Sequence, residues 1–262
     1  VKEAALAAGL NILQPLKIRE TGFVDNLRRL APELIIVVAF GQILPAEILD
    51  LPPYGCINVH ASLLPKYRGA APIHWAVING EEKTGVTTMY MDRGLDTGDM
   101  LLKAEIDIGS EETAGSVHDR LADLGANVLV ETLANLADIK RKPQNHPEST
   151  YAPMLSREDE FIHWEKDNIQ VVNLIRGMNP WPGAYTTYKG KAIKVFQAQV
   201  IEGKGQKAPG TIIGVDKDLG FTVQTRSGLV LVKKVQPQGG KRMEAAAFAR
   251  GYGLAVNDKL GD

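Results

Sequence analysis

The most constraining stretch of this 262-residue chain runs from Leu34 to Phe40 and consists of the residues LIIVVAF. It is continuously apolar and rich in β-branched side chains, which is typical of a strand buried on both faces of a parallel sheet. Further strands are expected at 55–60, 84–92 and 100–106, and helices at 45–50 and 111–139. Strands that alternate with helices predict an α/β domain with a mostly parallel sheet.

The chain changes character after residue 140. Residues 141–160 are polar and hold three prolines, which is typical of a linker. A helix is expected at 169–176 and a last one at 244–250, capped by Gly251. The short strands expected between them suggest a small β-barrel and lie at 184–188, 191–200, 210–215, 220–225 and 228–235. We therefore predict a domain at 1–140, a linker at 141–160 and a second domain at 161–262.

The net charge of −1 hides a strong asymmetry between the two halves. Residues 1–137 hold 11 Lys and Arg against 18 Asp and Glu, whereas residues 138–262 hold 19 against 13. The second half therefore carries a net charge of +6. Such a surplus fits contact with a polyanion such as a nucleic acid, although scattered surface lysines also produce it.

Composition excludes several classes of protein. With 44% apolar and 23% charged residues the chain fits an ordinary globular protein, and it has no apolar run long enough to cross a membrane. Its first ten residues do not look like a secretory signal, so a cytoplasmic location is expected. The single cysteine, Cys56, excludes an internal disulfide, and the scattered histidines predict no metal site.

Asn58 and His60 are the first candidate site residues. They lie two positions apart on a predicted strand, so their side chains point to the same face near its carboxyl end. Ligands bind at that end in open parallel sheets. An amide and an imidazole there can stabilise an oxyanion, but the pair could equally be satisfied by loop backbone.

Asp96 is the third candidate. It lies in a loop punctuated by Gly94 and Gly98, after the strand predicted at 84–92. If the strands are aligned, this loop opens at the same sheet edge as His60, where a carboxylate could orient the imidazole or accept a proton. The alternative is an aspartate that merely shapes a turn.

The stretch INVHASLLPKYRGAAPI at 57–73, followed by Gly85-Val-Thr and Leu95-Asp-Thr-Gly-Asp99, resembles the folate-dependent formyltransferases. The resemblance implies a Rossmann-like catalytic domain. It also implies that Asn58, His60 and Asp96, the last 36 residues after the histidine, are catalytic. It assigns folate binding to two segments, whose residues are Ser62, Leu63, Leu64 and Pro65, and Phe40, Gly41, Gln42 and Ile43.

The second half resembles the C-terminal domain of the methionyl-tRNA formyltransferases. The similar segments are 179–185, 189–191, 209–210 and 236–243. In that family the domain is an oligonucleotide-binding-like (OB-like) barrel that contacts initiator tRNA. The resemblance therefore implies initiator methionyl-tRNA as partner, with Arg68, Lys241 and Arg242 as candidate contacts, and it agrees with the basic charge of this half.

The implied reaction moves the formyl group of 10-formyltetrahydrofolate, a co-substrate, to the α-amino group of methionine on initiator tRNA by direct attack of the amine. Two alternatives remain at this point. One is a related formyltransferase or hydrolase that uses the same three residues with a non-tRNA acceptor, and the other is a non-catalytic RNA-binding protein. No metal is expected, and we expect a monomer.

The chain departs from the family at its start. Family members open with a strand–helix–strand unit of about fifty residues, and Val1 aligns with the helix that follows this unit. The natural protein is therefore expected to be longer than this sequence. Without that unit, the strand at 34–40 would lose a neighbour.

Overall fold

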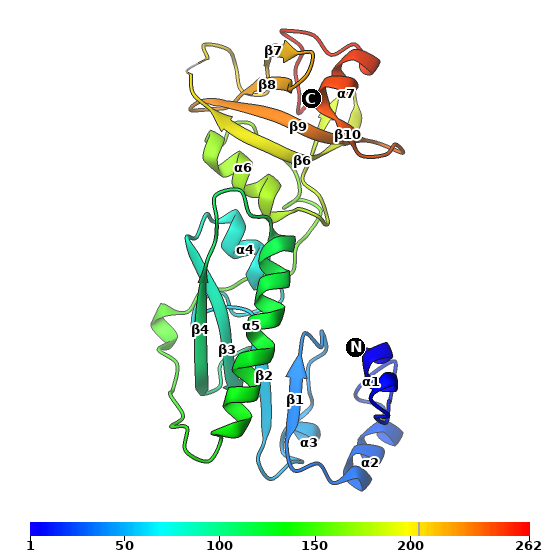
Figure 1. Cartoon of the computed structure of the whole chain (residues 1–262), viewed down its shortest axis with the longest axis vertical. Coiled ribbons are helices and arrows are strands. Elements are labelled where there is room, and N and C mark those ends of the chain that lie inside the picture. The colour runs from blue at the N-terminus through cyan, green and yellow to red at the C-terminus, as the bar shows by residue number, and fades with distance from the viewer. Residues whose placement is uncertain (204) are drawn as a thin grey trace.

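The chain forms two units that follow each other along the longest axis of the molecule (Figure 1). The computed structural model describes residues 1–203 and 205–262. The first unit combines helices with a four-stranded sheet, and the second is built on an antiparallel sheet of six strands. The predicted α/β class of the first part is confirmed, whereas the predicted limits at 140 and 160 remain a prediction.

The elements of the first unit follow the expected order with two additional helices. They are α1 (Lys2–Ala7), α2 (Thr21–Leu30), β1 (Ile35–Val38), α3 (Ala46–Leu49), β2 (Cys56–His60), α4 (Pro72–Ile78), β3 (Lys83–Tyr90), β4 (Met100–Asp107) and α5 (Ala114–Ala134). The sequence prediction did not include α2 and α4, which are short and lack a long apolar repeat. Helix α4 begins with Pro72, a residue that suits the first turn of a helix.

The sheet of the first unit is mixed rather than mostly parallel. Its order is β1-β2-β3-β4, in which β1 and β2 are parallel while β3 is antiparallel to both β2 and β4. The loop 91–99 between β3 and β4 is too short for the crossover that a parallel pair needs. The prediction was wrong here because it inferred strand direction from the alternation of strands and helices alone.

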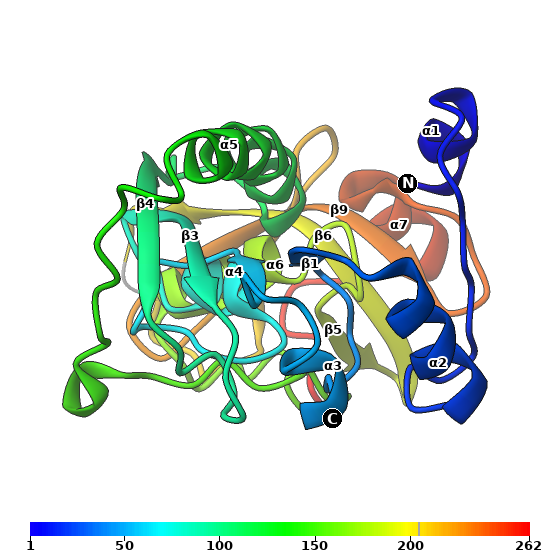
Figure 2. The ribbon, with the colours of Figure 1, turned by 90° about the horizontal axis from the view of Figure 1, so that it is seen from below.

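Strand β1 is less buried than its apolar sequence predicts. It lies at the edge of the sheet, and within the described residues it pairs with β2 alone. Three of its four residues are partly exposed, and Val38 is 57% exposed. The prediction of a strand buried on both faces is therefore wrong for this structure, since burial depends on neighbours as well as on side-chain type. Figure 2 shows α1 and α2 at one edge of the molecule and β4 at the opposite edge.

Two apolar clusters stabilise the first unit. One packs α5 against the sheet through Val117 and Leu121, which lie with Val86 of β3. The other lies under β1 and includes Ile48 of α3 and Cys56 of β2. Both clusters support β2 from its two sides, and thereby fix the strand that carries Asn58 and His60.

The second unit begins with α6 (Asn168–Gly177), after the 3-10 turn η1 (His146–Glu148) in the segment between the units. Its strands and last helix are β5 (Tyr185–Tyr188), β6 (Lys191–Ile201), β7 (Ile212–Asp216), β8 (Gly220–Gln224), β9 (Leu229–Pro237), β10 (Met243–Glu244) and α7 (Ala245–Tyr252). The predicted strands match these closely. Helix α7 extends two residues further than predicted and is capped by Gly253, whose φ of 65° is the left-handed conformation that glycine adopts readily.

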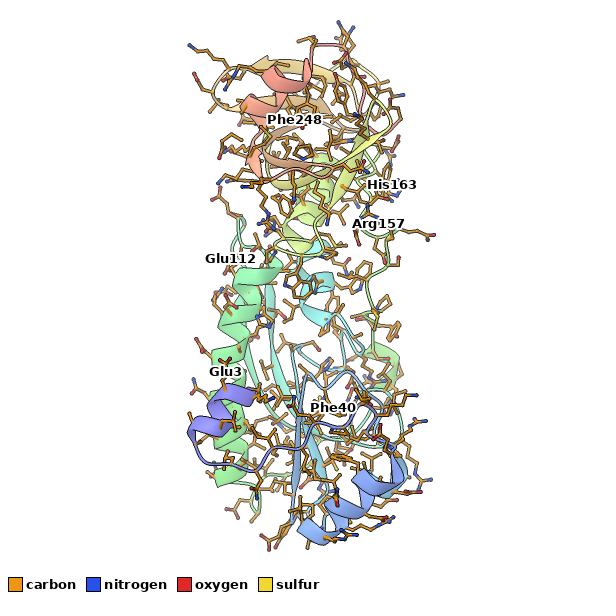
Figure 3. The ribbon with its side chains drawn as sticks, turned by 90° about the vertical axis from the view of Figure 1, so that its right-hand side faces the viewer. Glu3, Phe40, Glu112, Arg157, His163 and Phe248 are labelled. Carbon is orange, nitrogen blue, oxygen red and sulfur yellow. The ribbon has the colours of Figure 1, made fainter. Side chains whose placement is uncertain are left out.

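The sheet of the second unit does not close into a barrel within the described residues. Its strands follow the order β5-β6-β9-β8-β7, with β10 beside β9, and no pairing joins β5 to β7. The register shifts along β6 near Gln197, which bends the sheet around its core. Helix α7 then covers that core, with Phe248 1% exposed and close to Phe221 (Figure 3). The small OB-like barrel expected here thus takes the form of an open, curved sheet capped by a helix.

The two units are joined by direct contacts. Helix α6 packs on α4 of the first unit and on β6 of the second. The Arg176 guanidinium of α6 donates to the carbonyl oxygens of Gly109 and Glu112 at 3.1 and 2.8 Å, at the junction where Glu112 is labelled in Figure 3. A Cβ atom on Gly115 would lie 2.4 Å from Cδ of Pro180, so this close approach requires glycine.

Phe248 gives a direct test of the second core. Replacing Phe248 with Ala removes a buried ring and leaves a cavity, so we expect a loss of about 3–5 kcal/mol in the free energy of unfolding. The control is Leu219→Ala, because Leu219 is 56% exposed and should cost under about 0.5 kcal/mol. Chemical denaturation of both variants measures this, and equal losses would contradict the assigned core.

Cys56 gives a test of the core beneath β1. Its side chain is 1% exposed, and burial, with a smaller effect of Asp50, raises the pKa of the thiol to about 11. Because the thiolate is the reactive form, we expect the folded protein to react with a thiol reagent at pH 8 far more slowly than the urea-unfolded protein. Equal labelling rates in the two states would show that this core is open.

Candidate functional site

The candidate site lies where β1 and β2 end. The two strands are parallel and in register up to Val38 and Val59, so the loops that follow them leave the same edge of the sheet. On β2, Ile57 points into the core while Asn58 and His60 share the other face, as the period of two predicts. The imidazole of His60 is 6% exposed and Asn58 is partly exposed.

Asp96 reaches Asn58 and His60 from the loop between β3 and β4. Because β3 is antiparallel to β2, with Tyr90 opposite Ile57, this loop leaves the sheet at the edge where β2 begins, so the prediction that it opens at the edge of His60 is wrong. The loop instead folds back over the face of β2 that carries Asn58 and His60. Its φ of 52° is left-handed, a conformation that aspartate tolerates better than most residues. The loop is tightened by Asp92, whose Oδ1 accepts hydrogen bonds from the backbone N–H of Gly94 and the hydroxyl of Thr97. Gly98 has no room for a side chain, since a Cβ would lie 1.9 Å from the carbonyl oxygen of Tyr90.

The three predicted residues meet around the Asp96 carboxylate. Oδ2 of Asp96 lies 3.6 Å from Nδ1 of His60, and Oδ1 lies 3.4 Å from Nδ2 of Asn58. The backbone N–H of Gly69 donates to Oδ2 at 2.8 Å. The aspartate side chain is 12% exposed, so these contacts take place largely out of water, where they are stronger than at an open surface.

Tyr67 determines which nitrogen of His60 is available for chemistry. Nε2 of His60 lies 2.9 Å from the backbone carbonyl oxygen of Tyr67. A carbonyl oxygen only accepts, so Nε2 carries the hydrogen and Nδ1 is the atom that faces Asp96. The phenol of Tyr67 donates to Glu81 at 2.6 Å; burial and then this bond raise its pKa to about 12, which keeps the phenol protonated at neutral pH.

The Ser62–Pro65 segment forms a turn held by its own hydrogen bonds. The hydroxyl of Ser62 donates to the carbonyl of Lys66, and Thr87 of β3 bridges the Ser62 carbonyl and the Leu64 N–H. Leu64 is 1% exposed and packs with Met89 and Met100, and its carbonyl accepts from Lys103. Leu63 and Pro65 are partly exposed, so they are the members of the segment whose side chains can meet a ligand.

The second segment assigned to folate follows β1 at the same sheet edge. Phe40 and Ile43 are 41% and 74% exposed, an uncommon position for large apolar side chains so close to a polar cluster. Gly41 is also exposed, and Oε1 of Gln42 accepts the backbone N–H of Ile18. Figure 3 labels Phe40 near the middle of the first unit.

The three residues predicted to contact tRNA have different environments. Lys241 and Arg242 are exposed in the turn before β10, with the Arg242 guanidinium stacked 3.6 Å above the ring of Phe196. Arg68 is instead 9% exposed, and Nε and Nη2 of its guanidinium donate to Oε1 of Gln144 at 3.0 and 2.7 Å. Nε and Nη2 are therefore occupied within the first unit, and the contact of Arg68 with tRNA stays a prediction.

Sequence reasoning missed residues that act through the backbone or from the linker. Tyr67 holds His60 with a backbone carbonyl oxygen, a role that any residue type can fill, so only its place in the motif at 57–73 pointed to it. Gln144 is 6% exposed although it lies among polar residues between the units. Thr87 falls inside the Gly85-Val-Thr motif, and this was the one signal that pointed to it.

A hollow between the two units does not coincide with this cluster. It has a volume of about 930 Å³ and lies between the two units, among α4, α6 and β6. Asn58, His60 and Asp96 do not line it, so the site is defined by its chemistry rather than by its volume.

Among residues 1–203 and 205–262, no three His, Cys, Asp or Glu side chains gather as a metal site. No described helix is both long and apolar enough to cross a membrane.

Comparison with known proteins identifies the family of both units. The family "Formyl transferase" matches residues 2–133, and "Formyl transferase, C-terminal domain" matches residues 154–253. The methionyl-tRNA formyltransferase of Desulforamulus reducens is 50% identical over 264 aligned residues, which cover 100% of this chain and 83% of that protein.

Solved structures show the same fold. The methionyl-tRNA formyltransferase from Clostridium thermocellum has a TM-score of 0.63 at 22% identity, and the match covers 78% of this chain and 88% of that one. HypX from Aquifex aeolicus, solved with tetrahydrofolic acid, has a TM-score of 0.67 at 22% identity and covers 90% of this chain and 42% of that one. The two family matches and the relative of 50% identity show that the chain belongs to the formyl transferase family.

Proposed function

We propose that this chain transfers the formyl group of 10-formyltetrahydrofolate to the α-amino group of methionine on initiator tRNA. The observation that carries the proposal is the meeting of the Asn58, His60 and Asp96 side chains, with exposed apolar side chains in the loop after β1. The 50% identity to methionyl-tRNA formyltransferases along the whole chain favours this acceptor over a sugar or water.

The reaction needs an oxyanion site and a route for one proton. The amine nitrogen forms a bond to the formyl carbon, whose carbonyl oxygen becomes an oxyanion. The bond between that carbon and N10 of the folate then breaks. The amine loses a proton and N10 gains one, so the net change is the exchange of one hydrogen for the formyl group.

The cluster supplies both requirements. The Asn58 amide is one donor for the oxyanion. His60 is the second donor in its doubly protonated form, in which Nδ1 carries a hydrogen while the Nε2 hydrogen stays bonded to the Tyr67 carbonyl. Asp96, 3.6 Å from Nδ1, stabilises positive charge on the imidazole and relays the proton that the amine loses. The Gly69 N–H keeps the carboxylate in place throughout.

The folate is proposed to lie against Phe40 and Ile43, with Leu63 and Pro65 opposite. A pterin ring is flat and largely apolar on its faces, which fits exposed apolar side chains beside hydrogen-bonding loops. Ser62 and Leu64 shape this site from within, because their own polar groups are already paired. Gly41 and Gln42 complete the wall through the backbone of the loop after β1.

The tRNA is proposed to contact the basic second unit. Lys241 and Arg242 are exposed there, and Arg242 is held in place by its stacking on Phe196. The surplus of +6 in residues 138–262 supports such a contact, because neutralised phosphates release counterions. Arg68 is not part of this surface.

Incubation of the protein with 10-formyltetrahydrofolate and Met-tRNA tests the proposal directly. We expect formylmethionyl-tRNA as the product. Formate without formylmethionine would favour a hydrolase, and transfer to an amino sugar nucleotide but not to Met-tRNA would favour a different acceptor.

The catalytic assignment predicts large losses on truncation. Asn58→Ala and His60→Ala should each lower kcat on the order of a hundredfold or more, as loss of an oxyanion donor does. The control is His118→Ala, because the side chain of His118 is 57% exposed on α5 and should leave kcat unchanged. If the site variants keep near-normal rates while remaining folded, the assignment is wrong.

The tRNA surface predicts a change in salt dependence. Lys241→Ala combined with Arg242→Ala should weaken Met-tRNA binding and flatten the plot of log Kd against log salt by about one unit per lost phosphate contact. Lys207→Ala with Lys217→Ala is the control of equal charge, since both lysines are exposed on other loops. An unchanged slope in the first double variant would place the tRNA elsewhere.

A further inference from the structure

We propose that the segment 142–152, named here the clamp segment, is part of the catalytic site, and that Gln144 is a positioning residue for Asp96. This inference deepens the proposed function and rests on it. The segment lies between the two units in the chain, where a passive linker was expected. Its contacts are instead with the loops that carry Asp96 and Gly69.

Gln144 holds the Asp96 loop by its backbone. Nε2 of Gln144 donates to the carbonyl oxygens of Asp96 and Gly98, both at 2.8 Å. The side chain is 6% exposed, so these bonds have little competition from water. They fix the two carbonyls that flank Thr97, and thereby hold Asp96 in its left-handed conformation with the carboxylate turned to His60.

Arg68 fixes the orientation of Gln144 itself. Its guanidinium donates to Oε1 of Gln144 through Nε and Nη2, so the amide oxygen faces the cation and both amide hydrogens face the carbonyls. Arg68 is 9% exposed, and a buried cation polarises the amide that it contacts. Glutamine fits this position because it can accept from a cation and donate to two carbonyls at once.

The far end of the clamp segment holds the opposite side of the carboxylate. The N–H of Arg68 donates to the Thr150 carbonyl at 2.9 Å, and the N–H of Ala152 donates to the Arg68 carbonyl at 2.7 Å. These bonds bring Ala152 so close to Gly69 that a Cβ there would lie 2.6 Å from the Ala152 oxygen. Gly69, with a φ of 115°, then donates its N–H to Asp96 Oδ2.

One segment thus sets both the backbone of Asp96 and the donor that its carboxylate accepts. The near end is anchored as well, because Met100 and Lys142 exchange two backbone hydrogen bonds of 2.9 Å. A misplacement of about 1 Å at a reacting group can cost a hundredfold in rate. Loss of the Gln144 bonds should therefore act on the chemical step and leave the substrate-binding surfaces unchanged.

A double-mutant cycle distinguishes this role from a general loss of structure. The variants are Gln144→Met, which keeps the shape without hydrogen bonds, Asp96→Asn, and the two combined, all measured by single-turnover formylation of Met-tRNA. We expect Gln144→Met alone to lower the rate at least about tenfold, with KM for both substrates within about twofold. In the Asp96→Asn background we expect the same change to cost less than about twofold.

The controls separate folding from positioning. Gln206→Met makes the same replacement at an exposed site in the second unit and should leave the rate unchanged. Gln144→Glu keeps the acceptor for Arg68 and loses both donors, so it should show the rate loss of Gln144→Met. It takes the place of Gln144→Met in the cycle if that variant fails to fold.

Two results would overturn the inference. One is a single-turnover rate within about twofold of the unmodified protein for either Gln144 variant. The other is a rate loss on Gln144→Met that is as large in the Asp96→Asn background as in the protein with Asp96 intact. The unmodified protein separates this inference from the proposed function. If the unmodified protein makes no formylmethionyl-tRNA, the proposed function is wrong. If the unmodified protein is active and the Gln144 variants are equally active, only the proposed role of the clamp segment is wrong.

Discussion

The contact between the Asp96 carboxylate and Nδ1 of His60 is the interaction on which the site depends. It joins a strand end to a loop that comes 36 residues later, and it is held by the Gly69 N–H, the Asn58 amide and the Tyr67 carbonyl. Asn58 lies on β2, Tyr67 and Gly69 lie in the loop that follows it, and Asp96 lies in the loop after β3. The site therefore exists only when β2, the loop after β3 and the segment that follows α5 are all in place, which ties catalysis to the whole first unit.

The second unit contacts the first unit but contributes none of the residues that surround the Asp96 carboxylate. Arg176 on α6 binds two carbonyls of the first unit, and the close approach of Gly115 to Pro180 gives the junction a defined geometry. The near-neutral chain thus joins an acidic unit with the site to a basic unit suited to a polyanion. In this account, electrostatic attraction brings the tRNA to the basic unit while the chemistry takes place on the acidic one.

Sequence patterns predicted the parts of the site that depend on side-chain identity and short spacing. The period of two placed Asn58 and His60 on one face, and the glycines around Asp96 marked its loop. The same patterns could not predict the direction of β3, the exposure of β1 or the open second sheet, since these depend on which strands meet. Nor could they reveal the roles of Tyr67 and Gln144, which rest on a backbone carbonyl and on a fold-back of the chain.

We propose that the formyl group passes directly from one bound substrate to the other, and a donor with a labelled formyl group gives the sharpest test. In a single turnover, 10-formyltetrahydrofolate with a radiolabelled formyl carbon is mixed with the protein and Met-tRNA, and the reaction is quenched at intervals. We expect the label to pass from the folate to the methionine amine, with none on the protein at any time. Label on the protein, or its release as formate in place of formylmethionine, would contradict the account.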